Sequence, residues 1–159
     1  MKKVLAFLLM VVMATALFTG CSNPVYDDFE NFMNVEMVEV NADYEKITAE
    51  VGTWESLESD AELAKSLKEV LIPLVNGSLE KLNAITPETD EVKEVKAKYV
   101  KVMEAYKAGF ESYLAACETQ DEAKISEAET KLNEGVELLN EYNAALEELA
   151  AEVGAEIEY

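Results

Sequence analysis

An apolar side chain recurs every three or four residues along most of this chain, and this spacing is the strongest constraint on its fold. Between residues 25 and 57 the average step is about 3.5 residues, which keeps one apolar face of a helix directed toward a partner helix. The apolar positions there are Tyr26, Phe29, Met33, Met37, Val40, Tyr44, Ile47, Val51 and Trp54. Residues 60–84, 87–117 and 121–153 repeat the pattern, and no strand-like alternation interrupts it. The sequence therefore predicts an all-α protein.

Four amphipathic segments joined by short connections predict an antiparallel up-down four-helix bundle with long helices. Asn41 and Gly52 are weak points where the first helix can break. Pro73 lies inside the second segment, where a proline removes a backbone hydrogen bond and crowds the preceding turn. We therefore expect either a kink at Pro73 or a split helix with Asn76-Gly77 as the turn.

Capping residues stand at the starts of the later helices. Ser59 or Asp60 can cap the second helix, and Thr86 can cap the third. Thr119, followed three residues later by Glu122, matches a capping box for the fourth helix. These residues set the predicted helix starts.

The first twenty residues have the composition of a secretory signal peptide. A pair of lysines is followed by an almost wholly apolar run over residues 4–18 and by the small residues Thr19 and Gly20. The apolar run, about fifteen residues long, is shorter than the roughly 20 residues that a membrane-spanning helix needs. We therefore favour a signal that is removed over a permanent transmembrane helix.

Phe18-Thr19-Gly20-Cys21 resembles the lipobox of bacterial lipoproteins, with Phe18 standing where Leu is usual. The resemblance implies that Cys21 receives a diacylglyceryl group and that the chain is cut just before it. Two acyl chains are enough to anchor a protein stably to a bilayer. The alternative is an unmodified Cys21 after an ordinary signal.

The implied lipid anchor sets the domain organisation and the location. Residues 1–20 are the removed signal peptide, residues 21–25 the lipidated cysteine with a short tether, and residues 26–159 the helical bundle domain. We expect the protein outside the cytoplasm, anchored to the cell membrane by lipid on Cys21. In an envelope with two membranes, Ser22 resembles the sorting pattern of the outer membrane.

Acidic residues outnumber basic ones by 33 to 13, which gives a formal net charge of -20. This charge argues against nucleic acid as a partner, because binding it requires cationic side chains to neutralise phosphates. It also argues against a protein that lies flat on anionic lipid. It favours a role in solubility, because the negatively charged surfaces of two copies of the protein repel each other.

The chain contains no histidine. It therefore lacks the usual general base near neutral pH and the usual ligand of zinc and di-iron centres. We expect no enzyme activity, no cofactor and no metal centre. The acidic clusters at residues 27–30 and 88–91 lack the glycine-containing spacing of an EF-hand loop, so solvated acids and helix caps are favoured over weak calcium binding.

Tyr99, Tyr106 and Tyr113 are spaced by seven residues and line one edge of the third helix. We expect them to belong to the core and its rim, and the alternative is a ligand-stacking groove. Cys117 lies on the same apolar face, and neither histidine nor arginine is present to lower its pKa. We expect a small buried hydrophobe there, without an intrachain disulfide once Cys21 is acylated.

Several general features together resemble the YkyA-type cell-wall-binding lipoproteins. These are the lipobox, helices that begin almost at Cys21, and a Tyr-rich third helix leading into a Glu- and Asn-rich fourth over residues 132–149. The resemblance implies a cell-wall-binding lipoprotein and carries over no catalytic residue.

The function that we expect is a membrane-anchored, non-catalytic binding or scaffolding module of the cell envelope. Its partner would be another envelope protein or a wall component. The alternatives are a small-ligand or cation-binding lipoprotein, with a pocket near Tyr106 and Tyr142, and the cell-wall-binding lipoprotein that the resemblance implies.

Overall fold

The computed structural model describes residues 23–157, and every regular element in that part of the chain is a helix. The all-α prediction is confirmed. In chain order the elements are α1 (Pro24–Asn31), the π-helix η2 (Phe32–Glu36), α2 (Val38–Gly52), the 3-10 helix η3 (Trp54–Ser56), α3 (Asp60–Ser66), the π-helix η4 (Leu67–Leu71), α4 (Ile72–Ala84), α5 (Asp90–Thr119) and α6 (Glu122–Val153). The predicted signal peptide and the predicted lipidation site at Cys21 lie outside the described residues.

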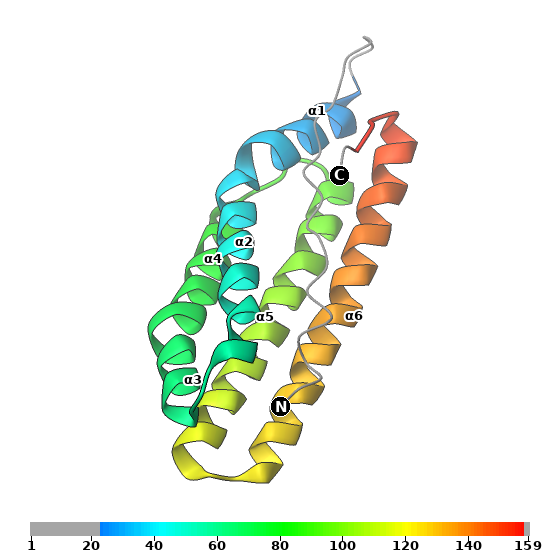
Figure 1. Ribbon diagram of the computed structural model, residues 1–159. Coiled ribbons are helices and arrows are strands. Elements are labelled where there is room, and N and C mark those ends of the chain that lie inside the picture. Colours follow the sequence, from blue (N-terminus) through cyan, green and yellow to red (C-terminus); the bar gives the residue numbers. More distant parts are fainter. Residues whose placement is uncertain (1–22, 158–159) are drawn as a thin grey trace.

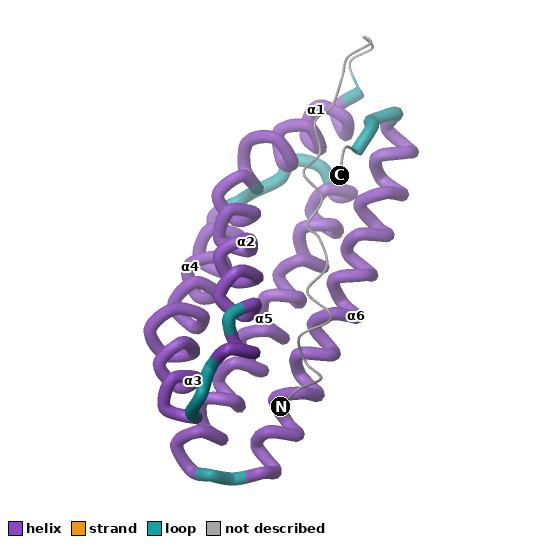
Figure 2. The backbone as a smooth tube through the Cα atoms, viewed as in Figure 1, coloured by secondary structure: helices purple, strands orange, loops and turns teal. Residues whose placement is uncertain are grey.

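The helices lie side by side along one long axis (Figures 1 and 2). The chain descends through α1 and α2, returns through α3 and α4, descends through α5 and returns through α6 (Figure 1). The end drawn uppermost, called the upper end below, therefore holds the start of α1, the connection between α4 and α5, and the end of α6. The α5–α6 turn lies at the opposite end.

Two π-helical segments interrupt the first half of the chain, where the sequence predicts continuous α-helices. Buried apolar residues spaced by four run through both segments, and these are Phe29, Met33 and Met37 through η2 and Leu63, Leu67, Leu71 and Val75 through η4. In an α-helix of 3.6 residues per turn, three successive steps of four carry the side chains about 120° around the axis. The wider π turn takes up the extra residue and keeps the apolar side chains on the core side.

Of the two weak points predicted in the first helix, Gly52 is the one at which the helix ends. Asn41 is buried inside α2 and does not interrupt it, and Gly52 is the last residue of α2. The other interruption, at η2, precedes Asn41. Helix propensity alone therefore identified one of the two breaks.

The second predicted helix is interrupted before Pro73 and continues after it. Pro73 stands in the first turn of α4, directly after η4, where the wide π turn leaves room for its ring. Asn76-Gly77 lies within α4, so the expected turn there is wrong. The neighbouring Val75 is fully buried, and its packing holds this stretch to the core as a helix. A bend of the helix axis at Pro73 stays a prediction.

The helix starts agree with the sequence in α3 and differ in α5. The Ser59 hydroxyl accepts a hydrogen bond from the Glu62 N–H at 3.3 Å, which confirms Ser59 as the cap of α3. Thr86 is wrong as the cap of α5, because that helix begins later, with Thr89 at the N-cap position. The backbone before Thr89 is held by a carboxylate from α1, described below.

The predicted capping box of the fourth helix is also wrong. Thr119 is the last residue of α5, and its hydroxyl donates to the Ala115 carbonyl at 2.7 Å. Gln120 then adopts a left-handed conformation, with φ of 56°, which ends α5. Asp121 caps α6 instead, accepting from the Ala123 N–H at 2.9 Å.

The predicted apolar faces form one buried core. In the first predicted helix every position of the predicted apolar face from Phe29 to Val51 is buried, and only Tyr26 and Trp54 at the two ends of that face are half-buried. Phe32 is buried as well, beyond the predicted face, because η2 turns it inward. In the second, Val70 and Leu74 are half-buried at the edge of the core.

Small residues let α5 and α6 pack closely. A Cβ atom added at Gly135 of α6 would lie 2.5 Å from Cε1 of the Tyr106 ring on α5. In the reverse direction, a Cβ atom added at Gly109 of α5 would lie 2.6 Å from a methyl carbon of Leu132 on α6. Each glycine thus receives a large side chain of the facing helix.

Gly135→Ala should lower the free energy of unfolding by about 1–3 kcal/mol, because the buried Tyr106 ring cannot move aside without disturbing the core. Gly77→Ala is the matched control, since no atom lies within 4 Å of a Cβ atom added there. That change in α4 should stabilise the protein by about 0.5–1 kcal/mol. Urea unfolding followed by circular dichroism measures both, and equal effects would contradict close packing at Gly135.

Candidate functional site

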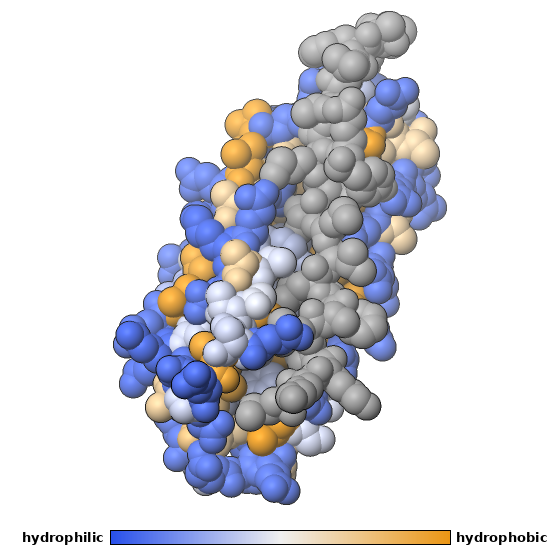
Figure 3. Space-filling model, in the orientation of Figure 1, coloured by the Kyte–Doolittle hydropathy of each residue, from blue (hydrophilic) through white to orange (hydrophobic). Residues whose placement is uncertain are grey.

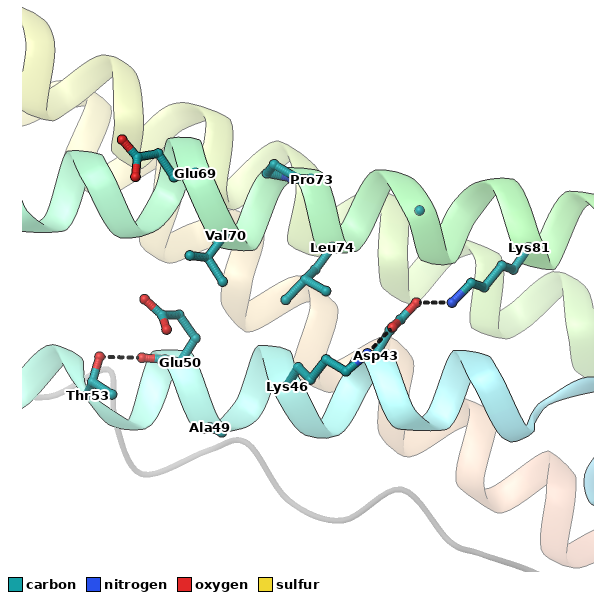
Figure 4. Close-up of a pocket in the computed structure, with 11 residues that line it drawn as sticks. Asp43, Lys46, Ala49, Glu50, Thr53, Glu69, Val70, Pro73, Leu74 and Lys81 are labelled. Atoms are coloured by element: carbon teal, nitrogen blue, oxygen red, sulfur yellow. Dashed lines mark hydrogen bonds and ion pairs between the residues drawn. The ribbon is translucent and has the colours of Figure 1, made fainter.

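A groove of about 680 Å³ lies between α2 and the strip formed by η4 and α4. Its lining includes the charged Asp43, Lys46, Glu50 and Lys81 and the apolar Val70 and Leu74. In Figure 4 the two apolar side chains point from η4 and α4 toward α2, between the charged side chains. The groove therefore combines an apolar floor with charges at fixed positions.

Asp43 is the buried charge of this groove, with a side chain only 7% exposed. Its Oδ2 accepts a hydrogen bond from Lys81 Nζ at 2.5 Å, and its Oδ1 accepts one from Lys46 Nζ at 2.9 Å (Figure 4). Burial alone would raise the pKa of Asp43, but the two lysines outweigh burial and hold that pKa below its ordinary value. The Asp43 carboxylate raises the pKa of Lys81 in return. The ionised pair ties α2 to α4.

Glu50 is held by a chain of hydrogen bonds at another part of the groove. The Trp54 indole N–H donates to Ser66 Oγ at 3.2 Å, and the Ser66 hydroxyl donates to Glu50 Oε1 at 2.6 Å. The Trp54 ring packs edge-on against Phe110 and Tyr113 of α5. The carboxylate is thus positioned by α3 and, through Trp54, by α5.

Two of the three carboxylates that line the groove are held by internal bonds. The Asp43 carboxylate is engaged by two lysines and Glu50 by Ser66, whereas Glu69 is exposed. Within residues 23–157, no group of three or more His, Cys, Asp or Glu side chains could hold a metal ion. The groove thus presents apolar side chains beside carboxylates that are ion-paired or hydrogen-bonded within the protein.

Asp28 forms a second buried tie, at the upper end of the molecule. Its carboxylate accepts hydrogen bonds from the Glu88 N–H at 3.1 Å, the Thr89 N–H at 2.8 Å and the Thr89 hydroxyl at 2.6 Å. Burial would raise the pKa of Asp28, but these bonds and the charge of Lys93 lower it. A carboxylate is favoured at a helix start, where the helix dipole is positive. Within the acidic cluster at residues 27–30, Asp28 is therefore a structural clamp between α1 and α5.

The three regularly spaced tyrosines lie in the core, as the favoured interpretation expected, and not in the groove. Tyr99, Tyr106 and Tyr113 are all buried. The Tyr99 ring packs against Tyr142, with centroids 4.7 Å apart, and Tyr106 stacks near Tyr44 at 6.4 Å. Burial raises the pKa of each of these tyrosines, and that of Tyr113 reaches about 12. The Tyr99 hydroxyl is buried without a hydrogen-bond partner in the described part of the chain.

Cys117 is half-buried and packs against the core. Burial raises the pKa of its thiol, and the charges of Asp60 and Glu118 raise it further. The thiol is therefore protonated near neutral pH, as expected from its acidic neighbour. It is less deeply buried than the apolar spacing predicted.

The outer surface is largely hydrophilic on the face that Figure 3 draws, with scattered hydrophobic side chains. Two large apolar residues are well exposed, Val35 at 66% and Val38 at 54%, both at the junction of η2 and α2. None of the helices between residues 23 and 157 is long and apolar enough to cross a membrane.

Local sequence spacing did not predict either of the two carboxylate ties. Asp43 is separated by 38 residues from Lys81, and Asp28 by 61 residues from Thr89, so neither pair shows up in local spacing. The sequence does contain one indication that both acids lie near the core. Each directly precedes a core aromatic residue, Tyr44 or Phe29, so each lies at the edge of an apolar face.

Comparison with known protein families gives a match over most of the chain. Residues 1–120 match the model of a family described as EMYY-motif containing lipoprotein. The matched range includes Cys21, the groove and all of α5, and it ends before α6. No curated protein and no solved structure matches the chain. The resemblance to YkyA-type lipoproteins is not shown by these comparisons.

Lys81→Met should lower the free energy of unfolding by about 1–3 kcal/mol at neutral pH, because Asp43 stays buried and loses its shorter hydrogen bond. Since the folded-state pKa of Asp43 is lowered, its ionisation stabilises the protein above the unfolded pKa of about 3.9, and this stability is lost as pH falls through the folded pKa. The variant raises that folded pKa, so its acid destabilisation should begin at a higher pH.

Urea unfolding between about pH 3 and pH 7 measures this shift. Lys68→Met is the control, because Lys68 is exposed and has no ion-pair partner in the described chain. Its effect should stay within about 0.5 kcal/mol. Identical pH profiles for the two variants would contradict the role of Lys81.

Proposed function

The chain belongs to the EMYY-motif containing lipoproteins, and we propose that it acts as a non-catalytic binding or scaffolding module of the cell envelope. The family match supports a membrane-anchored, extracytoplasmic lipoprotein. The groove between α2 and α4 is the observation that supports this role. Its apolar floor lies between Asp43 and Glu50, whose carboxylates are held by bonds within the protein. The partner that we propose is another envelope protein or a wall component.

The anchor in this proposal is a diacylglyceryl group on Cys21, exposed by removal of residues 1–20. The family range begins at residue 1 and so includes both the signal and the lipobox. In an envelope with two membranes, Ser22 supports placement in the outer membrane.

The helical body in this proposal is an antiparallel up-down four-helix bundle. Its segments are α1 with α2, α3 with α4, α5 and α6, and their alternating directions in Figure 1 support it. A rigid body of this kind suits scaffolding, because its faces keep their positions relative to the anchor.

Crosslinking in cells followed by purification tests the binding role. Leu74→Glu places a charge on the half-buried apolar floor of the groove and should reduce recovery of the crosslinked partner severalfold. Val38→Glu is the matched control, since Val38 is exposed on α2 and does not line the groove. Circular dichroism checks that both variants are folded. If the wild-type protein were always recovered without a crosslinked partner, a scaffolding role would be contradicted.

A small-ligand-binding lipoprotein is the second candidate, and the Tyr99 hydroxyl supports it. A buried hydroxyl without a partner carries a desolvation penalty of about 1–3 kcal/mol, which a bound polar ligand would relieve. Calorimetric titration with calcium and a panel of metabolites separates the two functions. Heat that disappears in Tyr99→Phe would favour the ligand-binding candidate.

Cys21→Ala should move the protein from the membrane fraction to the soluble fraction, because the thiol that carries the lipid is gone. Cys117→Ala, the matched cysteine control, should remain with the membranes. Fractionation of cells followed by immunoblotting measures both. If Cys21→Ala stayed on washed membranes, lipid on this residue would not be the anchor.

A further inference from the structure

Lysines are concentrated in residues 93–107 of α5, against the charge of the whole chain. Residues 93–107 contain five of the thirteen lysines and only two glutamates, a local net charge of +3 in a chain of net charge -20. The charge of the whole chain argued against an anionic partner. This segment is locally cationic, although Asp90 and Glu91 just before it make residues 90–104, the first half of α5, neutral overall.

Three of these lysines line one pocket of about 480 Å³, where the α4–α5 connection meets α5. We call it the lysine pocket, and it is formed by Lys93, Lys96 and Lys101 together with Ile85, Val100 and Glu104. Ile85 and Val100 are apolar and pack on the core. The lysine pocket thus places three cations and one carboxylate around an apolar floor.

The three lysines are differently engaged. Lys96 Nζ donates to the Ile85 carbonyl at 2.6 Å, which holds its ammonium group at the pocket wall. Lys93 forms an exposed ion pair with Asp90 at 2.9 Å, which contributes little in water. Lys101 has no ion-pair or hydrogen-bond partner among residues 23–157. The pocket therefore has a positioned cation and a free one, and Glu104 neutralises only part of their charge.

The lysine pocket begins near the upper end of the molecule, close to α1, and continues down the first half of α5 to Glu104. Lys93 is near enough to Asp28 of α1 for its charge to lower the pKa of that carboxyl, and Asp28 binds the backbone just before α5. The chain from Asn23 back to Cys21 is two residues long and can span at most about 7 Å. A lipid on Cys21 therefore enters the bilayer close to the end that carries the pocket.

We propose that the lysine pocket binds the phosphate of an anionic phospholipid headgroup in the membrane that holds the anchor, which rests on the proposed lipidation of Cys21. Lys96 and Lys101 would pair with the phosphate oxygens, since ammonium groups are point charges suited to phosphate. The apolar floor at Ile85 and Val100 would contact the glycerol and the start of an acyl chain. Inorganic phosphate offers the same charge without an apolar part, so the floor favours the lipid.

The test uses the mature, acylated protein in a zwitterionic detergent and titrates it with dihexanoyl phosphatidylglycerol, dihexanoyl phosphatidylcholine and inorganic phosphate. Nuclear magnetic resonance shifts of the α5 amides report binding. We expect phosphatidylglycerol to bind about tenfold or more tightly than either of the other two probes, and the affinity to fall as salt is added. No binding of phosphatidylglycerol, or equal binding of phosphatidylcholine, would overturn the proposal. If inorganic phosphate bound as tightly as phosphatidylglycerol, the proposal that the bound phosphate belongs to a lipid headgroup would be wrong.

Lys96→Gln with Lys101→Gln should weaken the binding of phosphatidylglycerol about tenfold. Lys124→Gln with Lys131→Gln on α6 removes the same charge and should change it less than about twofold. Lys101→Gln alone keeps the test valid if the double variant does not fold, because Lys101 makes no internal bond within residues 23–157. Unchanged binding in Lys101→Gln and in the double variant would contradict the proposed site.

The same titration on Cys21→Ala separates this proposal from the anchor. A soluble short-chain lipid needs no anchor, so this variant should bind phosphatidylglycerol as the wild type does. If Cys21→Ala bound phosphatidylglycerol but stayed with the membranes, the proposed lipid anchor would be wrong and the proposed headgroup site would still stand.

Discussion

Close packing of α5 against α6 is the contact on which the rest of the structure depends. These are the two longest helices described, with 30 and 32 residues, and a turn centred on Gln120 joins them. Gly109 and Gly135 each accept a large side chain of the facing helix, so the two helix axes can come close. Helices in water depend on such tertiary packing more than on their own propensity. The shorter helices α1, α3 and α4 pack against α5, and α2 packs mainly against α4.

The apolar spacing predicted the class and the core because helix periodicity decides which side chains can be buried together. The spacing did not predict the π-helical segments, because an average step of about 3.5 residues does not show where the individual steps of three or four residues occur. The local steps do carry that information. A run of three steps of four, from Leu63 to Val75, is incompatible with one straight α-helical face, and η4 lies within that run. Successive steps of four in an apolar pattern therefore indicate where a helix widens, and the average step does not.

The charged ties show what one-dimensional spacing cannot reveal. Asp28 and Asp43 are two of 33 acidic residues in the chain, and nothing in composition separates them from the rest. Burial separates them, because a carboxylate removed from water must be met by donors or cations. Asp43 is met by two lysines and Asp28 by backbone and hydroxyl donors. Lys46 is three residues from Asp43, but Lys81, Glu88 and Thr89 lie far along the chain from these acids, so only the assembled fold brings them together.

The Asp28 tie also bears on how the body is oriented relative to a membrane. A flexible linker would let an anchored domain rotate freely, but α1 begins at Pro24 and is clamped to the start of α5 four residues later. From Pro24 onward, the path to α5 is therefore short and fixed. With lipid on Cys21, the upper end faces the bilayer, and the groove between α2 and α4 lies along the side of the body. In the function that we propose, a partner can then reach that groove without competing with lipid.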